Sequence, residues 1–156
     1  MQVIRFAPLI GSPGELLWAE GEASYVLAGR AIRATVTRPP VDLVAWCAEL
    51  EAGELAGIQA CRLMTGEAGV AHGLLSWVRP AYRRRGVFAA IQAAVDAALL
   101  AEGIGFLRSW VVEGPEEAAM AAAIEARGGA RVGEVVHAIA GRRVRYAEFL
   151  RPLLAA

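Results

Sequence analysis

The fold is decided by the stretch Val78-Arg79-Pro80-Ala81-Tyr82-Arg83-Arg84-Arg85-Gly86-Val87-Phe88-Ala89. A strand is expected to end at Arg79, because Pro80 has no N–H for a ladder and restricts the residue before it. A helix is expected to begin at Gly86. The first N–H groups of a helix lack intrahelical partners and carry about half a positive charge. This corner is therefore predicted to bind a phosphate compound, since Gly86 lets the backbone approach an anion.

The residues before and after this loop predict a sheet and a helix. Three strands are expected before it, at Leu43–Leu50, Leu55–Leu63 and Val70–Val78, joined by Gly-containing turns. After it, apolar residues recur every four positions, which predicts a helix with a polar opposite side. The apolar positions are Val87, Ile91, Val95 and Leu99, and the polar ones are Gln92 and Asp96.

The rest of the chain adds further elements on both sides of this core. A strand is expected at Phe106–Val112, a helix from Glu116 to Arg127 that ends at Gly128, and a hairpin formed by Val132–Ile139 and Arg143–Leu150. The first 40 residues are harder to interpret: Val3–Pro8 predicts a strand, Pro13–Glu22 a helix capped near Ser12, and Ser24–Thr37 another strand. We expect one domain over residues 1–156, with a core at 41–150.

Composition excludes several classes of function. The formal net charge is zero, which argues against nucleic acid as the main partner because phosphate neutralisation needs a basic excess. The most apolar stretch, 86–106, is interrupted by Gln92, Asp96 and Glu102, so no uninterrupted apolar span of about 20 residues exists to cross a membrane. No signal peptide is recognised, so we expect a cytoplasmic protein without a metal, whose Cys47 and Cys61 are buried free thiols.

The Val78–Ala89 loop resembles the acyl-coenzyme A signature of the GNAT superfamily of N-acyltransferases, V-x-P-x-(Y/F)-(Q/R)-x-x-G-x-(G/A). Val78, Pro80, Tyr82, Arg83 and Gly86 match this pattern, whereas Phe88 stands where Gly or Ala is usual. The resemblance extends over residues 43–150. It implies an α/β (α+β) fold with a GNAT-like mixed, mostly antiparallel central sheet, helices on both faces and a shortened N-terminal acceptor region.

The resemblance also implies an activity and a set of binding residues. The chain is expected to be an N-acetyltransferase that moves an acetyl group from acetyl-coenzyme A, or another acyl-coenzyme A, to a primary amine by direct attack in a ternary complex. The residues expected at the cofactor are Trp77, Val78, Arg83, Arg84, Arg85, Gly86, Val87, Phe88 and Ala89. The acceptor, a small-molecule or peptide amine, is not identified by the sequence.

Two catalytic roles are predicted. The resemblance implies that the backbone N–H of Val78 holds the thioester oxygen and that a base lies on the same strand. In one branch of the superfamily this base is six residues before the Val, a position held here by His72. Strict strand alternation would place His72 on the same face as Ser76. The other interpretation of His72 is a partly buried histidine bonded to a carbonyl.

Some features depart from the family and keep alternatives open. Many members protonate the leaving thiolate with a Tyr from the second helix, but Ala118–Arg127 contains none, and Tyr146 is only a distant candidate. The short N-terminal region leaves an open site or one completed by a second subunit in a homodimer. The alternatives are an acyl-coenzyme A-binding module with little or no catalysis, and a structural or nucleic-acid-binding protein that uses Arg83–Arg85.

Overall fold

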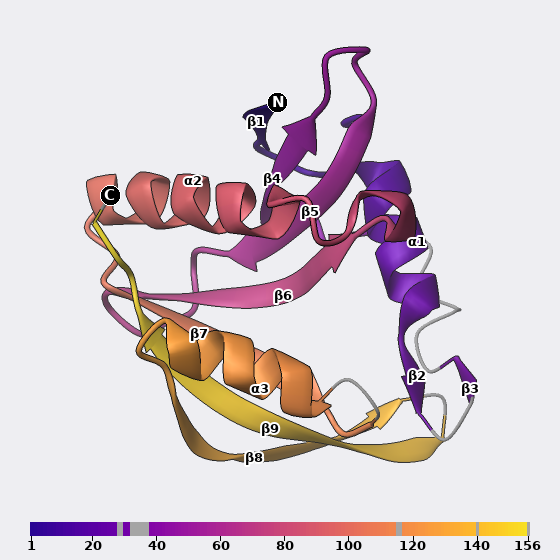
Figure 1. The fold of residues 1–156 in the computed structure, drawn as a ribbon. Helices are drawn as coiled ribbons and strands as arrows, with labels where there is room; N and C mark the ends of the chain where they lie inside the picture. Colours follow the sequence, from indigo (N-terminus) through magenta and orange to yellow (C-terminus); the bar gives the residue numbers. More distant parts are fainter. Residues whose placement is uncertain (28–29, 32–37, 115–116, 140, 156) are drawn as a thin grey trace.

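A computed structural model of the protein describes residues 1–27, 30–31, 38–114, 117–139 and 141–155 (Figure 1). Seven strands form one sheet in the order β1-β4-β5-β6-β7-β9-β8. All neighbouring pairs are antiparallel except β6 and β7, which are parallel. The strands are β1 (Gln2–Phe6), β4 (Leu43–Glu49), β5 (Leu55–Arg62), β6 (Val70–Val78), β7 (Phe106–Val112), β8 (Ala130–Ile139) and β9 (Arg142–Pro152).

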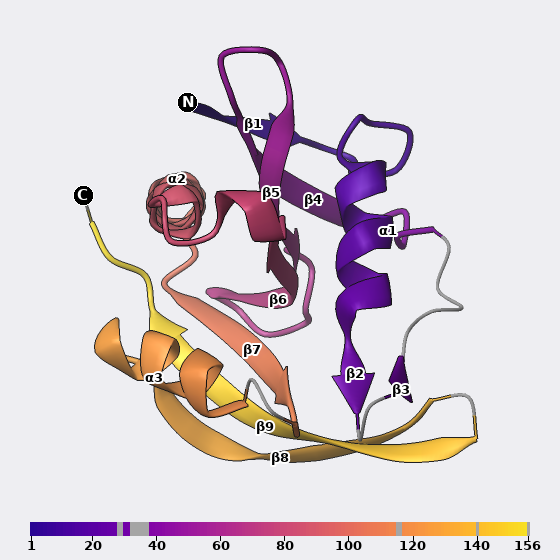
Figure 2. The same cartoon turned by 45° about the vertical axis from the view of Figure 1, so that its right-hand side comes forward.

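Three α-helices cover the two faces of this sheet (Figure 2). They are α1 (Glu15–Ser24), α2 (Val87–Ala101) and α3 (Glu117–Ala126). Helix α1 packs on one face over Ile58 and Leu75, while α2 packs on the other over Ala56 and Ala71. Helix α3 lies on the α2 side, where Met120 and Ile124 contact the core residues of β7 and β9. No α-helix in the described part of the chain is both long enough and apolar enough to cross a membrane.

The predicted mixed sheet with helices on both faces is confirmed. The three-strand meander, the strand Phe106–Val112 and both later helices lie within two residues of their expected bounds. The strand ends were predictable because glycines mark the turns. Gly53, Gly66 and Gly141 all adopt the left-handed backbone conformation that ends a strand. Local sequence signals were therefore sufficient for the region after residue 42.

The predicted polar side of α2 is wrong. Gln92 is 5% exposed and Asp96 is fully buried, so both lie on the covered side of the helix beside Ile91 and Val95. Asp96 is buried because Arg151, from the distant strand β9, donates two hydrogen bonds to its carboxylate. Because Arg151 is 55 residues away in the sequence, the spacing of apolar residues in the helix does not predict that Asp96 is buried.

The N-terminal region differs from expectation in two ways. The first strand and the helix are present, but the helix begins at Glu15 after the N-cap Gly14, which has no side-chain cap. Ser12 instead accepts a hydrogen bond from the Gly14 N–H at 3.2 Å. The strand expected over 24–37 is replaced by two short paired strands, β2 (Val26–Leu27) and β3 (Arg30–Ala31), and the remaining residues 28–29 and 32–37 lie outside the described part.

The two cysteines are free and buried, as predicted. They lie on opposite faces of the sheet, because Cys47 packs in the core under α1 and Cys61 in the core under α2. Burial raises the pKa of each thiol to about 12. We expect neither thiol to react with an aromatic disulfide reagent at pH 8 in the native protein, and both to react in denaturant. Rapid labelling of one thiol in the native protein would contradict this packing.

Candidate functional site

The two parallel strands in the middle of the sheet separate after a short seam. β6 pairs with β7 only from Val70 and Phe106 to Gly73 and Ser109. Beyond that point the strands splay apart, and a cavity of about 180 Å³ opens between them. Its walls come from β6, β7, the end of α1 and the facing sides of α2 and α3. The sheet is thus interrupted at its centre, next to the loop that the sequence singled out.

A β-bulge in β6 lies at the start of this gap. The register with β5 passes from Gly73 opposite Cys61 to Leu75 opposite Ala60, so Leu74 is the extra residue. A bulge reverses the alternation of side chains along the strand. Before it, the Cα of Gly73 faces Gln59 on the α2 side; after it, Leu75 packs on the α1 side and Ser76 donates a hydrogen bond to Gln59 on the α2 side.

Backbone N–H groups of β6 point into the gap. The Arg79 N–H donates to Ala56 O at 2.9 Å, which fixes the side of the strand that pairs with β5. Successive N–H groups of a strand point to opposite sides, so those of Val78 and Ser76 point away from β5. Because β7 has already diverged after Ser109, these donors have no strand partner on that side, and of the two residues Ser76 lines the cavity. The expected orientation of the Val78 N–H is compatible with a ligand lying in the gap.

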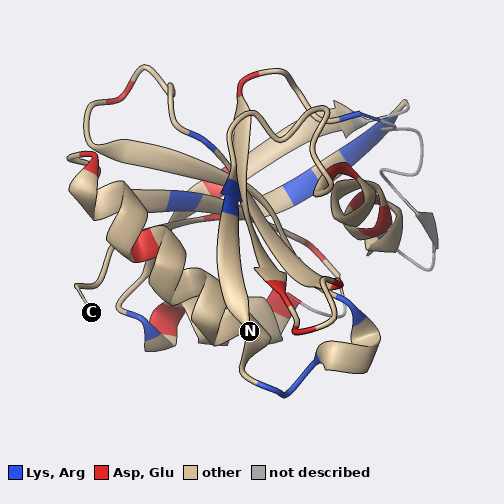
Figure 3. Ribbon diagram, turned by 90° about the horizontal axis from the view of Figure 1, so that it is seen from above, with Lys and Arg blue, Asp and Glu red and all other residues tan. Residues whose placement is uncertain are grey.

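The loop after β6 ends at the N-terminus of α2. Gly86 is the N-cap with φ 77°, a left-handed conformation, and a Cβ at this position would meet nothing within 4 Å. Arg84 also has a positive φ, 62°. Non-glycine residues adopt this region rarely and often at binding loops. The basic loop lies at the edge of the molecule where α2 begins (Figure 3).

The arginines of the loop have different roles. Arg83 donates through Nε to Val78 O at 2.9 Å and so braces the loop. Arg79 forms ion pairs with Glu20 and Glu54. The Tyr82 hydroxyl donates a hydrogen bond to Glu54 as well. These contacts hold the turn in place. The exposed side chains of Arg84 and Arg85 extend from it beside Gly86.

The other residues predicted at the cofactor are divided among the core, the cavity and the surface. Val87 is buried in the core under α2, and Ala89 is exposed. Phe88 lines the cavity and therefore turns away from the helix N-terminus. Trp77 also lines the cavity, but from the α1 side, where it packs near Gly21. The loop residues 79–87 are not part of the cavity wall, and α2 meets the cavity through Phe88 and Gln92.

The prediction that His72 shares a face with Ser76 is wrong, because the Leu74 bulge lies between them. His72 lies on the α1 side, where its ring meets that of Trp110 edge-on at 4.4 Å. Its Nε2 is buried and has no hydrogen-bond partner in the described part of the chain. Burial, together with the charges of Arg108 and Arg62, lowers the pKa of His72 to about 4. His72 does not line the cavity itself; it contacts Trp110, which does.

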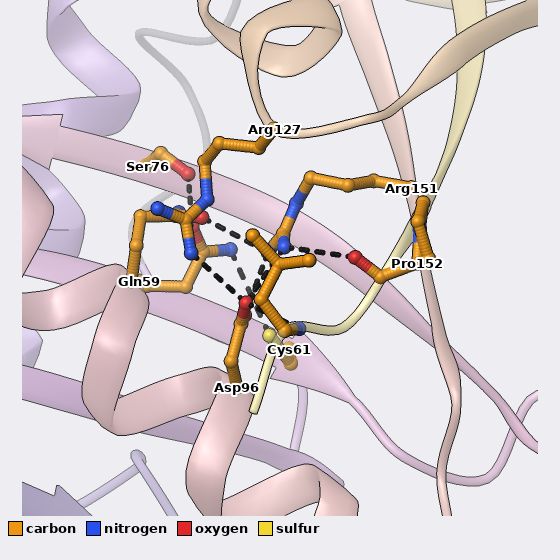
Figure 4. Close-up of polar contacts among 9 residues, drawn as sticks. Gln59, Cys61, Ser76, Asp96, Arg127, Arg151 and Pro152 are labelled. Carbon is orange, nitrogen blue, oxygen red and sulfur yellow. Dashed lines mark hydrogen bonds and ion pairs between the residues drawn. The ribbon is translucent and has the colours of Figure 1, made fainter. Parts of the chain in front are cut away.

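A polar cluster on the α2 side of the cavity was not predicted (Figure 4). It comprises Gln59, Ser76, Gln92, Asp96, Arg127 and Arg151. All of these except Asp96 line the cavity. The sequence signal was the pair of positions 92 and 96 directly beside the apolar stripe of α2, which carry polar residues into the interior.

Known proteins resemble this chain in their fold and not in their sequence. No protein-family model and no curated protein sequence matches the chain. The ribosomal-protein-S18-alanine N-acetyltransferase of Escherichia coli superposes with a TM-score of 0.69 at 14% identity, covering 99% of this chain and 96% of that one. A GNAT superfamily phosphinothricin acetyltransferase from Sinorhizobium meliloti, solved in complex with AcCoA, gives 0.64 at 18% identity over 98% and 89%.

Proposed function

We propose that this chain, whose fold is that of the GNAT N-acetyltransferases, transfers an acyl group from an acyl-coenzyme A to a primary amine. The observation that carries the proposal is the alignment of two features on one side of the sheet. The left-handed N-cap Gly86 begins α2, and the gap between β6 and β7 runs along the same helix. A long ligand with a phosphate at one end and a thioester at the other matches this layout.

The diphosphate of the ligand would lie at Gly86. The free N–H groups at the start of α2 and the helix dipole favour an anion there, and Gly86 has no side chain to obstruct it. Arg84 and Arg85 are exposed beside this end and supply further positive charge. Arg83 acts differently, since its bond to Val78 O stabilises the loop.

The pantetheine arm would lie between the splayed strands, where it can bond to the free edge of β6 as a strand would. Its thioester carbonyl would then accept a hydrogen bond from a β6 N–H, either that of Val78, as the sequence predicts, or that of Ser76 nearer the bulge. A preorganised donor at this place stabilises the negative charge that develops when an amine attacks the carbonyl.

The amine acceptor would approach from the α1 side of the gap. The described wall there consists of Tyr25, Leu74, Trp77 and Trp110. The two acetyltransferases compared above have different acceptors in their names, a ribosomal-protein alanine and phosphinothricin. The fold therefore leaves the acceptor open, and this wall would select it.

The thiolate that leaves needs little assistance at neutral pH. Free thiols have a pKa of about 8.5, so a thiolate is a good leaving group without a strong acid beside it. The described part of α3 lines the cavity with Met120, Ala123 and Ile124, none of which can donate a proton. This wall also favours the second candidate function, an acyl-coenzyme A-binding module that transfers the group slowly or not at all.

Thermal unfolding with acetyl-coenzyme A tests the binding step. Ligand at a hundred times its Kd should add about 2.7 kcal/mol to the free energy of unfolding. For a chain of this size the Tm should rise by roughly 5–10 °C. No rise would favour a structural or nucleic-acid-binding protein. Release of free thiol with a panel of amines would then separate the enzyme from the binding module.

His72 remains the proposed general base on the acceptor side, where it lies behind Trp110 and is not itself part of the cavity wall. Its lowered pKa of about 4 keeps it neutral at neutral pH, but it also makes His72 a weaker base than an ordinary histidine. Activity that needs this neutral form should fall as the pH drops through that value and not near 6.5. We expect His72→Gln to lower kcat by roughly a hundredfold, as for a lost general base, with little change in the KM for acyl-coenzyme A. Unchanged turnover would assign His72 to the packing of Trp110.

A further inference from the structure

The polar cluster on the α2 side of the cavity contains more positive charge than negative. Asp96 is fully buried and accepts two bonds from Arg151, each 2.8 Å long. Arg127 donates a third bond, at 2.9 Å, to the same carboxylate. Two guanidinium groups therefore share one carboxylate among the described side chains of the cluster. The excess charge belongs to Arg127, whose side chain is 28% exposed, whereas Asp96 and Arg151 form the buried, balanced pair.

Arg127 carries this excess to the cavity wall. Arg151 is almost completely buried, and its bonds to Asp96, Gln92 and the Pro152 carbonyl occupy its donors. Arg127 lines the cavity, bonds to Asp96 only through Nη2, and has a buried Nε with no hydrogen-bond partner in the described residues. A buried N–H without a partner costs free energy that an incoming acceptor would recover.

The cluster lies where the acyl end of the proposed ligand would be. Asp96 is ten residues beyond Gly86, about 15 Å further along α2, and Ser76, the second of the two proposed thioester donors, belongs to the cluster. Gly73, at the end of the β6–β7 seam, is closely approached by polar groups: a Cβ there would lie 3.0 Å from the amide nitrogen of Gln59 and 3.4 Å from Ser109 Oγ. The space beside the seam is therefore bordered by amide, hydroxyl and guanidinium groups.

We infer that the preferred acyl group ends in a carboxylate, so that the donor is a dicarboxylic acyl-coenzyme A of the malonyl or succinyl class. This inference rests on the proposed function. The carboxylate would accept a bond from the Arg127 guanidinium and restore the charge balance of the cluster. An acetyl or longer alkyl group would offer no such acceptor and would place apolar atoms against Gln59 and Ser76.

Affinities for acyl-coenzyme A pairs of equal chain length test the inference. Isothermal calorimetry should compare malonyl- with propionyl-coenzyme A, and succinyl- with butyryl-coenzyme A. We expect at least one dicarboxylic member to bind about 10- to 100-fold more tightly than its alkyl partner, as for a charge-assisted hydrogen bond. Arg127→Gln should abolish this preference and leave the affinity for free coenzyme A unchanged, which shows that the variant is folded.

Arg131→Gln is the matched control. Arg131 is half exposed on β8 and has only a 3.5 Å contact with Glu134, so its removal changes the net charge equally without touching the cavity. A preference that disappears in both variants would reflect long-range charge and would overturn the inference. If all acyl groups bind equally to the wild type, the inference is wrong and the proposed function stands. If neither free coenzyme A nor any ester binds, the proposed function fails as well.

Discussion

Replacing Gly86 with valine should weaken acyl-coenzyme A binding by at least about a hundredfold, because the side chain obstructs the α2 amides and removes their bonds to the diphosphate. Gly86 has φ 77° and nothing within 4 Å of its Cβ direction, so the valine would protrude into the space in front of the helix. The protein should still fold, since forcing a residue with a Cβ into this conformation costs about 1–2 kcal/mol. Calorimetric titration with coenzyme A measures the effect directly.

Gly66→Val separates the strain from the loss of binding. Gly66 lies in the exposed turn before β6, with φ 78° and equally open surroundings, so valine there imposes a similar backbone cost. The two variants should lose comparable Tm, but only the Gly86 variant should lose affinity. Full binding by Gly86→Val would show that the phosphate lies elsewhere and would remove the main support for the proposed function.

Asp96→Ala should reduce the free energy of unfolding by about 3–5 kcal/mol, as for a buried ion pair that loses one partner. The variant leaves the Arg151 guanidinium buried without a counter-charge and frees the N–H of Leu154, which bonds to Asp96 at 3.1 Å. For a chain of this length the Tm should fall on the order of 10 °C. Urea unfolding at pH 7 gives the free energy.

Asp42→Ala is the appropriate control, since Asp42 also pairs with an arginine, Arg62, but on the surface. A surface pair contributes about 0–1 kcal/mol, so this variant should be nearly neutral. Burial raises the pKa of Asp96, but the bonds from Arg151, Leu154 and Arg127 more than offset it and leave the pKa below its usual value. The Asp96 contribution is therefore complete above about pH 4 and is lost as the pH falls through the lowered pKa. Equal effects of both substitutions would contradict the buried pair.

Most of the fold could be predicted because its signals are local. The change from period-two strands to the period-four stripe of Val87 and Ile91, with Pro80 and Gly86 between them, fixed the strand–loop–helix unit. Gly128 and Gly141 marked the ends of later elements in the same way. The region before residue 40 has fewer such proline and glycine signals, and its short β2–β3 pair was not predicted.

The candidate site was predictable only where it depends on one segment. The loop at Gly86 was found, but two parts of the cavity depend on distant residues. The bulge at Leu74 arises from pairing with β5 and cannot be read from the alternation of β6 itself, so His72 was placed on the wrong face. Similarly, Asp96 was expected on the solvent side because its partner Arg151 lies on the last strand.

The short seam between β6 and β7 has a consequence for how the molecule holds together. Four residue pairs, from Val70–Phe106 to Gly73–Ser109, are the hydrogen-bonded connection between the half-sheet β1-β4-β5-β6 and the half-sheet β7-β9-β8. A ligand lying in the gap with its amides bonded to β6 would act as an additional strand. It would add hydrogen bonds between the half-sheets to the core under α2 that both already share, so that part of the rigidity of the protein would be supplied by its own substrate.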